Sequence, residues 1–148
     1  ELEQWAQQAV TGFWRQRLFP DGLDRLRQHL AEGHQVVLIT GNLKPIVDPL
    51  GAWLEVDRMV AAHPEIAEGY LTGRLVGGTM SGEAKAATAH LTAELLGLDL
   101  ASSYAYTDSY DDRTLLESVG RPVAVNPDWR LRRLTRRRGW PVLRWKHF

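Results

Sequence analysis

The stretch that decides the fold class is GHQVVLITGN, residues 33–42. Its centre, Val36 to Ile39, is an uninterrupted run of branched apolar residues, which is typical of a short strand buried on both faces of a parallel sheet. The run ends in the polar segment Thr40-Gly41-Asn42. Apolar residues then recur at helical spacing, so we expect a helix to begin at this segment, with Pro45 in its first turn and Pro49 kinking or interrupting it.

The same alternation of strands and helices covers the rest of the chain. Strands and helices that alternate through short loops predict an α/β fold with a parallel sheet. Ligands of such folds gather at the carboxyl ends of the strands, so we expect the polar segments 40–42 and 108–112 to share one site. We predict further helices over residues 2–18, 20–32, 81–96, 111–119 and 129–138, strands over residues 59–62, 104–107, 122–125 and 142–143, and a small hairpin over residues 65–75.

Composition narrows the class of protein. The chain has 148 residues, of which 44% are hydrophobic and 24% charged, as expected for one globular domain with a sizeable core. Since the 18 basic residues equal the 18 acidic ones, no general attraction to nucleic acid or to an anionic membrane is expected. The absence of cysteine excludes disulfides, thiolate catalysis and cysteine zinc sites. No apolar run approaches the roughly 20 residues of a membrane span, and we expect a cytoplasmic protein.

The helix predicted over residues 129–138 contains six arginines and suggests nucleic-acid binding. A solvated helix face explains this composition better, because Trp129, Leu131 and Leu134 supply an inward side and the arginines occupy the rest. We therefore expect no nucleic-acid partner.

Three carboxylates, Asp108, Asp111 and Asp112, follow the strand predicted over residues 104–107. Close carboxylates repel one another, so a hard cation such as Mg²⁺ would stabilise them at the end of a strand. The alternative is that Asp108 caps the next helix and the other two interact favourably with its dipole. Both interpretations stay open.

Two further segments carry candidate ligands for a phosphate group. The hydroxyl of Thr40 and the free N–H groups of a helix start could bind a phosphate oxygen, although Thr and Asn are also ordinary helix caps. Lys85 lies in the first turn of the helix over residues 81–96, where it opposes the helix dipole, so a phosphate or carboxylate partner is expected unless the side chain extends into solvent. The apolar residues of that helix expected to point inward are Ala84, Ala87, Leu91 and Leu95.

In this order the elements resemble the haloacid dehalogenase (HAD) superfamily, and most closely its phosphoserine-phosphatase-like subfamily of phosphomonoester hydrolases. The likeness rests on residues 33–42, 82–86, 106–112, 120–128 and 138–143. It implies a Rossmann-like three-layer parallel sheet. Residues 1–18 would be the end of a helical cap and residues 19–148 a core domain that lacks its first strand.

The resemblance also implies roles for single residues. Thr40, with Gly41 and Asn42, would bind the transferring phosphoryl group, and Lys85 would neutralise its charge. Asp108 would bind Mg²⁺, and Asp112 would be the second acid, holding the metal or Lys85. The implied reaction is attack by an aspartate on a small phosphorylated metabolite, phosphoserine being one candidate, and hydrolysis of the resulting aspartyl-phosphate.

One part of the family pattern is missing, because no Asp-x-Asp motif precedes Thr40. In the family this motif supplies the nucleophile, and its strand is the central one of the sheet. We therefore expect the 148 residues to be the C-terminal part of a phosphatase, inactive alone, with an N-terminal segment or a second chain supplying the strand between those that end at Ile39 and Thr107. The alternatives are a non-catalytic α/β interaction module derived from a phosphatase, and a phosphotransferase.

Overall fold

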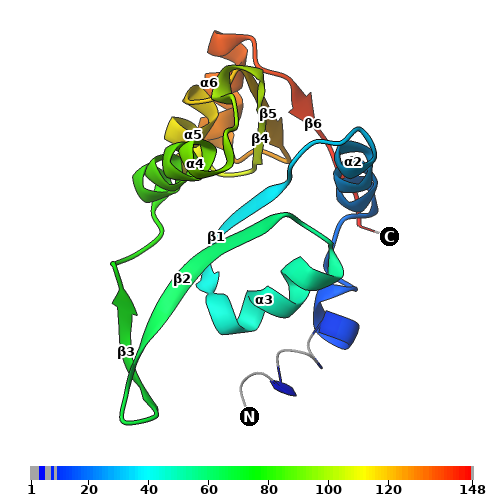
Figure 1. Ribbon diagram of the computed structural model, residues 1–148. Helices are drawn as coiled ribbons and strands as arrows, with labels where there is room; N and C mark the ends of the chain where they lie inside the picture. Colours follow the sequence, from blue (N-terminus) through cyan, green and yellow to red (C-terminus); the bar gives the residue numbers. More distant parts are fainter. Residues whose placement is uncertain (1–3, 6–7, 9, 148) are drawn as a thin grey trace. The chain divides into compact units, whose positions relative to one another are not determined.

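The computed structural model describes residues 4–5, 8 and 10–147, and the chain divides into two compact units. Residues 1–79 with 146–148 form unit 1, and residues 80–145 form unit 2. Each unit contains one three-stranded sheet (Figure 1). A further strand that would complete a single sheet stays a prediction, as does the cap–core boundary after residue 18.

Unit 1 contains a mixed sheet in the order β1-β2-β3. Strands β1 and β2 are parallel, and β2 and β3 form the predicted antiparallel hairpin. Helix α3 packs against β1 and β2 (Figure 1), where Val47 and Ala61 are almost fully buried. The elements of this unit after its first turn are α2 (Pro20–Ala31), β1 (Val37–Leu43), α3 (Lys44–Trp53), β2 (Arg58–Ala67) and β3 (Tyr70–Val76).

The strand β1 is longer than the sequence predicted. It runs through Thr40 to Asn42 and ends at Leu43, with an irregular register against β2 between Ile39 and Leu43. Helix α3 therefore begins at Lys44, after Leu43, and the expectation that Thr40 to Asn42 open a helix is wrong. The physical reason is that pairing resumes at Leu43 with Ala62, which holds the chain extended past the polar segment. The helix continues through Pro49 without interruption.

The first predicted helix is also corrected. Of the described residues in this region, Gln4, Trp5 and Gln8 are α-helical, as predicted, and Val10–Trp14 form a π-helical turn, η1. Residues 15–18 are turn and bend, so the helix does not extend to Leu18. Gly12, inside this segment, has a low helix propensity. Leu2 and Ala9, which belong to the same prediction, lie outside the described residues.

Unit 2 contains a parallel sheet in the order β4-β5-β6, as predicted. Helices α5 and α6 pack against it, and Leu116, Ala124 and Leu131 are fully buried at its centre. The elements are α4 (Gly82–Leu96), the 3₁₀ turn η2 (Leu100–Ser102), β4 (Tyr104–Thr107), the 3₁₀ turn η3 (Tyr110–Asp112), α5 (Arg113–Glu117), β5 (Arg121–Val125), α6 (Trp129–Arg138) and β6 (Val142–Leu143).

The inward face of α4 differs from the prediction. Leu91 and Leu95 are 58% and 63% exposed, Ala87 is also exposed, and Ala84 is only partly covered. Small residues occupy the buried face instead, because they allow the helix to lie close to its neighbours. The buried residues of α4 are Gly82, Ala86, Thr92 and Ala93.

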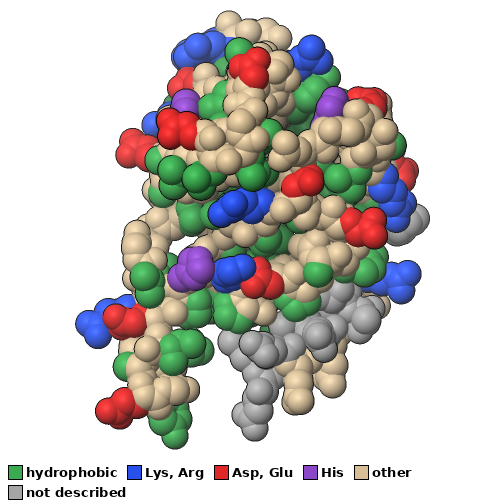
Figure 2. All heavy atoms as spheres, viewed as in Figure 1, with side chains coloured by type: hydrophobic (Ala, Val, Ile, Leu, Met, Phe, Trp, Pro, Cys, Tyr) green, Lys and Arg blue, Asp and Glu red, His purple; other side chains and the backbone are tan. Residues whose placement is uncertain are grey.

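The surface of the chain agrees with its balanced charge. Figure 2 shows acidic and basic side chains interspersed over the face in view. In α6, Leu131 is buried and Leu134 is partly buried, as predicted, whereas Trp129 is 73% exposed and does not point inward. Within the described part of the chain, no helix has both the length and the apolar character needed to cross a membrane.

Candidate functional site

The chain turns sharply after β4, where the acidic cluster lies. Ser109, and not Asp108, caps the 3₁₀ turn η3, because its hydroxyl oxygen accepts a hydrogen bond from the N–H of Asp111 (3.2 Å). The alternative in which Asp108 is a helix cap is therefore wrong. Asp108 is exposed, and its carboxylate has no hydrogen-bond or ion-pair partner among the residues that the structure describes. It is thus available to a ligand.

Lys85 and Asp112 form a charge pair beside this turn. The Lys85 ammonium lies 3.0 Å from both carboxylate oxygens of Asp112, and the Thr107 hydroxyl donates to Oδ2 at 2.8 Å. Only 20% of the Lys85 side chain and 10% of the Asp112 side chain are exposed, so the pair is largely screened from water. The carboxylate partner expected for a lysine in the first turn of a helix is present, and the solvent-exposed alternative is wrong.

Gly82 explains how α4 comes close enough to deliver Lys85. A Cβ atom at this position would lie 1.6 Å from the carbonyl oxygen of Asp111. Since heavy atoms cannot approach so closely, a side chain here would push the first turn of α4 away from η3. The glycine three residues before Lys85 therefore sets the distance between the lysine and Asp112.

Asp128 is a positioning residue that the sequence analysis did not identify. Its carboxylate accepts the N–H groups of Tyr110 (2.7 Å) and Leu131 (2.8 Å), and its own N–H donates to the carbonyl of Asp108 (2.9 Å). Burial alone would raise the pKa of Asp128, but N–H groups of Leu131, Tyr110 and Arg130, with the Arg130 charge, outweigh it and lower that pKa. Its position directly before helix α6, where aspartate is a favoured N-cap, is the sequence signal that identifies it.

Thr40 lies in unit 1, within the irregular part of β1. Its hydroxyl oxygen accepts hydrogen bonds from both the backbone N–H and the side-chain amide of Asn42, each at 3.1 Å. A hydroxyl has two acceptor lone pairs and one donor, so the remaining capacity of Thr40 is its O–H. Gly41 and Asn42 are exposed. A single hydroxyl donor at the surface suits an anionic oxygen.

The structure thus brings together one part of the predicted site. Lys85 and Thr107 both contact Asp112 in unit 2, and Asp108 directly follows the last residue of β4. Thr40 to Asn42 belong to unit 1. The site predicted to be shared between the two strand ends therefore stays a prediction.

The fit of the acidic cluster to a metal ion is partial. The Asp108 carboxylate offers hard oxygen ligands of the type that Mg²⁺ prefers, whereas the Asp112 carboxylate is occupied by Lys85 and Thr107. The geometry supports Asp112 as the holder of Lys85, and its role as a metal ligand stays a prediction. Within the described ranges, the one group of three potential ligands whose atoms lie within 4.8 Å of one another is His29, Glu32 and His34, in unit 1.

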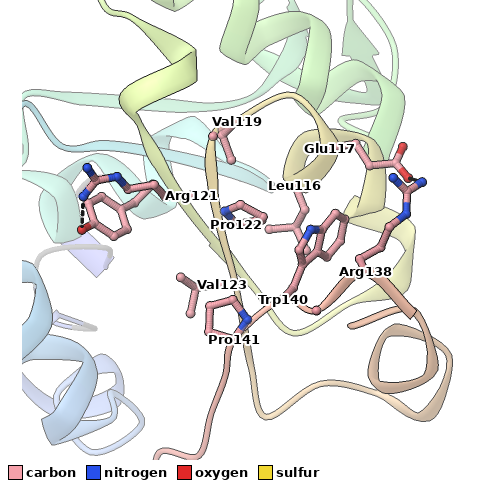
Figure 3. Close-up of a pocket in the computed structure, with 12 residues that line it drawn as sticks. Leu116, Glu117, Val119, Arg121, Pro122, Val123, Arg138, Trp140 and Pro141 are labelled. Atoms are coloured by element: carbon pink, nitrogen blue, oxygen red, sulfur yellow. Dashed lines mark hydrogen bonds and ion pairs between the residues drawn. The ribbon is translucent and has the colours of Figure 1, made fainter. Parts of the chain in front are cut away.

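A surface pocket of about 480 Å³ lies elsewhere in unit 2 (Figure 3). Tyr104 and Arg121 begin β4 and β5, so the pocket is at the amino ends of these parallel strands, away from Asp108. Both of its arginines are engaged, Arg121 with the Tyr104 hydroxyl (2.7 Å) and Arg138 with Glu117 (3.0 Å), as the dashed lines of Figure 3 mark. The expected ligand side of the sheet is the opposite one.

The chain is similar in sequence to a known family and to several known proteins. The model of the family "haloacid dehalogenase-like hydrolase" matches residues 1–117. The "Inhibition of morphological differentiation protein" of Streptomyces azureus is 39% identical over 127 residues, which are 85% of this chain and 46% of that protein. "Phosphoserine phosphatase SerB1" of Mycobacterium tuberculosis is 41% identical over 123 residues, 82% of this chain and 40% of that protein. The chain thus spans less than half the length of these relatives.

Solved structures show the same fold. A protein of unknown function from Bordetella pertussis Tohama I superposes with a TM-score of 0.87 at 33% identity, over 99% of this chain and 66% of that one. A probable phosphoserine phosphatase from Vibrio cholerae superposes with a TM-score of 0.69 at 23% identity, over 78% of this chain and 36% of that one. The second likeness concerns the fold alone.

Proposed function

The chain belongs to the haloacid dehalogenase-like hydrolases, and from this premise we propose that it is part of a Mg²⁺-dependent phosphatase that hydrolyses a small phosphomonoester. The observation that carries the proposal is the Lys85–Asp112 pair at the end of β4, largely screened from water and fastened by Thr107. A cation held in one position beside an exposed, unpaired carboxylate suits an anionic phosphoryl group and its counter-ion. Relatives named as phosphatases favour the same reaction.

The candidate site residues have separate roles in this proposal. Lys85, held by Asp112, stabilises negative charge on the phosphoryl oxygens, and the Thr40 hydroxyl donates a hydrogen bond to one of them. Asp108 would hold Mg²⁺, and Asp112, which holds Lys85, would be the second acid of the metal site. Bound Mg²⁺ supplies charge neutralisation on the phosphoryl group. Asp128 keeps the loop that carries Asp108 in place.

The nucleophile in this proposal is an aspartate outside these 148 residues. One of its carboxylate oxygens attacks phosphorus, and the bond from phosphorus to the ester oxygen breaks. The ester oxygen leaves as the alcohol by taking a proton from the general acid of the same missing motif, which regains a proton from the water of the next step. Water then hydrolyses the aspartyl-phosphate, releasing inorganic phosphate. The segment that carries this aspartate, from the same or a second polypeptide, also supplies the central strand. Since relatives include phosphoserine phosphatases, phosphoserine is the first substrate to test.

The test compares the 148-residue chain with the complete product of its coding region in a Mg²⁺-dependent phosphatase screen of small phosphomonoesters. We expect activity in the longer product only. Lys85→Met and Asp108→Asn should each reduce its rate by about 10²–10³-fold, the usual effect of removing one group that stabilises transition-state charge. His90→Ala, an exposed position on α4, is the control.

Full activity with normal Mg²⁺ dependence in the Asp108→Asn variant would contradict the assignment of the site. Inactivity of the longer product toward every phosphomonoester would favour a non-catalytic module. Transfer of the phosphoryl group to an added alcohol in preference to water would identify a phosphotransferase.

A further inference from the structure

A second cluster of potential ligands lies in unit 1, at the end of α2. His29, Glu32 and His34 each offer one ligand atom, and these atoms lie within 4.8 Å of one another. The Nδ1 atoms of the two histidines are 2.8 Å apart, and the Glu32 carboxylate lies 3.7 Å from Nε2 of His34. We propose that these three residues form a binding site for a Zn²⁺-like transition-metal ion. The proposal is independent of the phosphatase reaction.

The backbone holds the two histidines together. The N–H of Gly33 donates to the carbonyl of Leu30 and the N–H of His34 donates to that of His29, each at 3.0 Å, while Gly33 has a φ of +77°. This is the Schellman pattern of helix ends, which brings the residues at the positions of His29 and His34 into side-chain contact. That contact is usually hydrophobic. Here two imidazoles occupy it, so the ligands are brought together before any ion binds.

The ligand chemistry selects the class of ion. Two imidazoles and one carboxylate are a donor set typical of zinc, whereas Mg²⁺ prefers oxygen ligands alone. Zinc–nitrogen bonds of about 2.0–2.1 Å at a tetrahedral angle place two nitrogens about 3.3 Å apart, so the imidazoles would open by about half an ångström. An ion bound to both Nδ1 atoms replaces the hydrogen bond between them, and the neutral ring that donated it then carries its proton on Nε2.

Two features beside the cluster favour a cation and outnumber a nearby charge that opposes it, that of Arg25. The carbonyl end of α2 carries a partial negative charge, which stabilises positive charge near its last turn. Glu32 contributes a carboxylate, and the side-chain amide of Gln28 donates to its Oε1 at 3.1 Å. That contact restrains the carboxylate and leaves Oε2 on the side of His34. A bound ion would tie the end of α2 to the segment that leads into β1.

The experiment titrates the metal-free 148-residue chain with ZnCl₂ against a chromophoric chelator, with calorimetry for stoichiometry. We expect one ion per chain, and a rise in Tm with zinc. His29→Ala and His34→Ala should each weaken binding by at least about 10- to 100-fold, the effect seen even for residues that only support ligands. His90→Ala, an exposed histidine of unit 2, should bind zinc as the parent chain does.

His34→Gln keeps the length and polarity of the side chain without the imidazole, so it separates loss of binding from loss of folding, which circular dichroism checks. Zinc binding unchanged in the His29→Ala, His34→Ala double variant would overturn the proposal and show an adventitious ion only. Absence of binding by the folded parent chain at millimolar ZnCl₂ would overturn it as well, and would leave the two histidines as a hydrogen-bonded pair.

Discussion

The apolar runs of β1 and β4 each end in a threonine followed by a polar segment, and the two segments are held in different ways. Thr40 to Asn42 are stabilised within the segment, by two hydrogen bonds from Asn42 to Thr40. The segment after β4 is held from outside: Lys85 comes from α4 and Asp128 from the start of α6. The difference shows that a polar segment can be stabilised by its own hydrogen bonds or by residues from distant elements. Only in the second case does the geometry of the site depend on the packing of the whole unit.

The largest effect is expected from Gly82→Ala. The added Cβ would meet the Asp111 carbonyl at 1.6 Å, and backbone on both sides has little freedom to move. We expect unit 2 to lose about 3 kcal/mol of stability, the upper end for overpacking, measured by urea denaturation. Gly12→Ala adds the same methyl group where no atom lies within 4 Å and is the control. An unchanged midpoint for Gly82→Ala would show that the close approach of α4 does not matter.

The next largest effect concerns the charge pair. Lys85→Met leaves the Asp112 carboxylate largely covered and without its cation, so we expect a loss of about 2 kcal/mol, below the value for fully buried pairs. The matched control is Lys44→Met, which removes a less buried pair with Asp48 in unit 1, with 37% and 44% of the two side chains exposed, and should cost about 0.5 kcal/mol. Denaturation of both variants gives the comparison. Equal losses would mean that the greater burial of the Lys85–Asp112 pair does not increase its contribution to stability.

A smaller effect is expected from Asp128→Ala. It removes the cap of α6 and the bond to Tyr110, so at pH 7 we expect a loss of about 1 kcal/mol. Because the folded-state pKa of Asp128 is lowered, its contribution is complete above the ordinary carboxyl pKa and is lost as the pH falls through the folded value. Urea denaturation from pH 7 downward checks this. If the difference in stability between parent and variant stayed the same at the lowest pH, the contribution of Asp128 would not depend on its charge.

The smallest effect on stability is expected from Thr40→Val. Among the residues that the structure describes, Asn42 alone donates hydrogen bonds to this hydroxyl, and Asn42 is exposed, so we expect a loss of at most about 1 kcal/mol. Thermal unfolding measures this loss. The companion variant Asn42→Ala removes the side-chain amide that donates to the Thr40 hydroxyl. A loss larger than that of Lys85→Met would reverse the comparison between the two segments.

Sequence reasoning recovered most of the elements, and its errors are informative. The predicted bounds of β4, α6 and β6 agree with the structure, because apolar strand runs and the helical spacing of apolar residues are local signals. The prediction that Leu91 and Leu95 lie on the buried face of α4 is wrong, because the contact of Gly82 with Asp111 decides the orientation of the helix. The start of α3 was misplaced because pairing with β2 overrides the local preference of Thr40 to Asn42.

The same distinction between local signals and tertiary packing applies to the candidate site. Sequence alone determined which residues are candidates, namely Thr40, Lys85, Asp108 and Asp112, because residue type and position at strand and helix ends suffice for that. Only the tertiary structure decided which of them act on one another. Lys85 and Asp112 are 27 residues apart, and their contact depends on how closely α4 packs against η3. The distance between residues far apart in the chain follows from tertiary packing. The spacing of residues close in the chain follows from backbone geometry, and a sequence pattern contains only this local information.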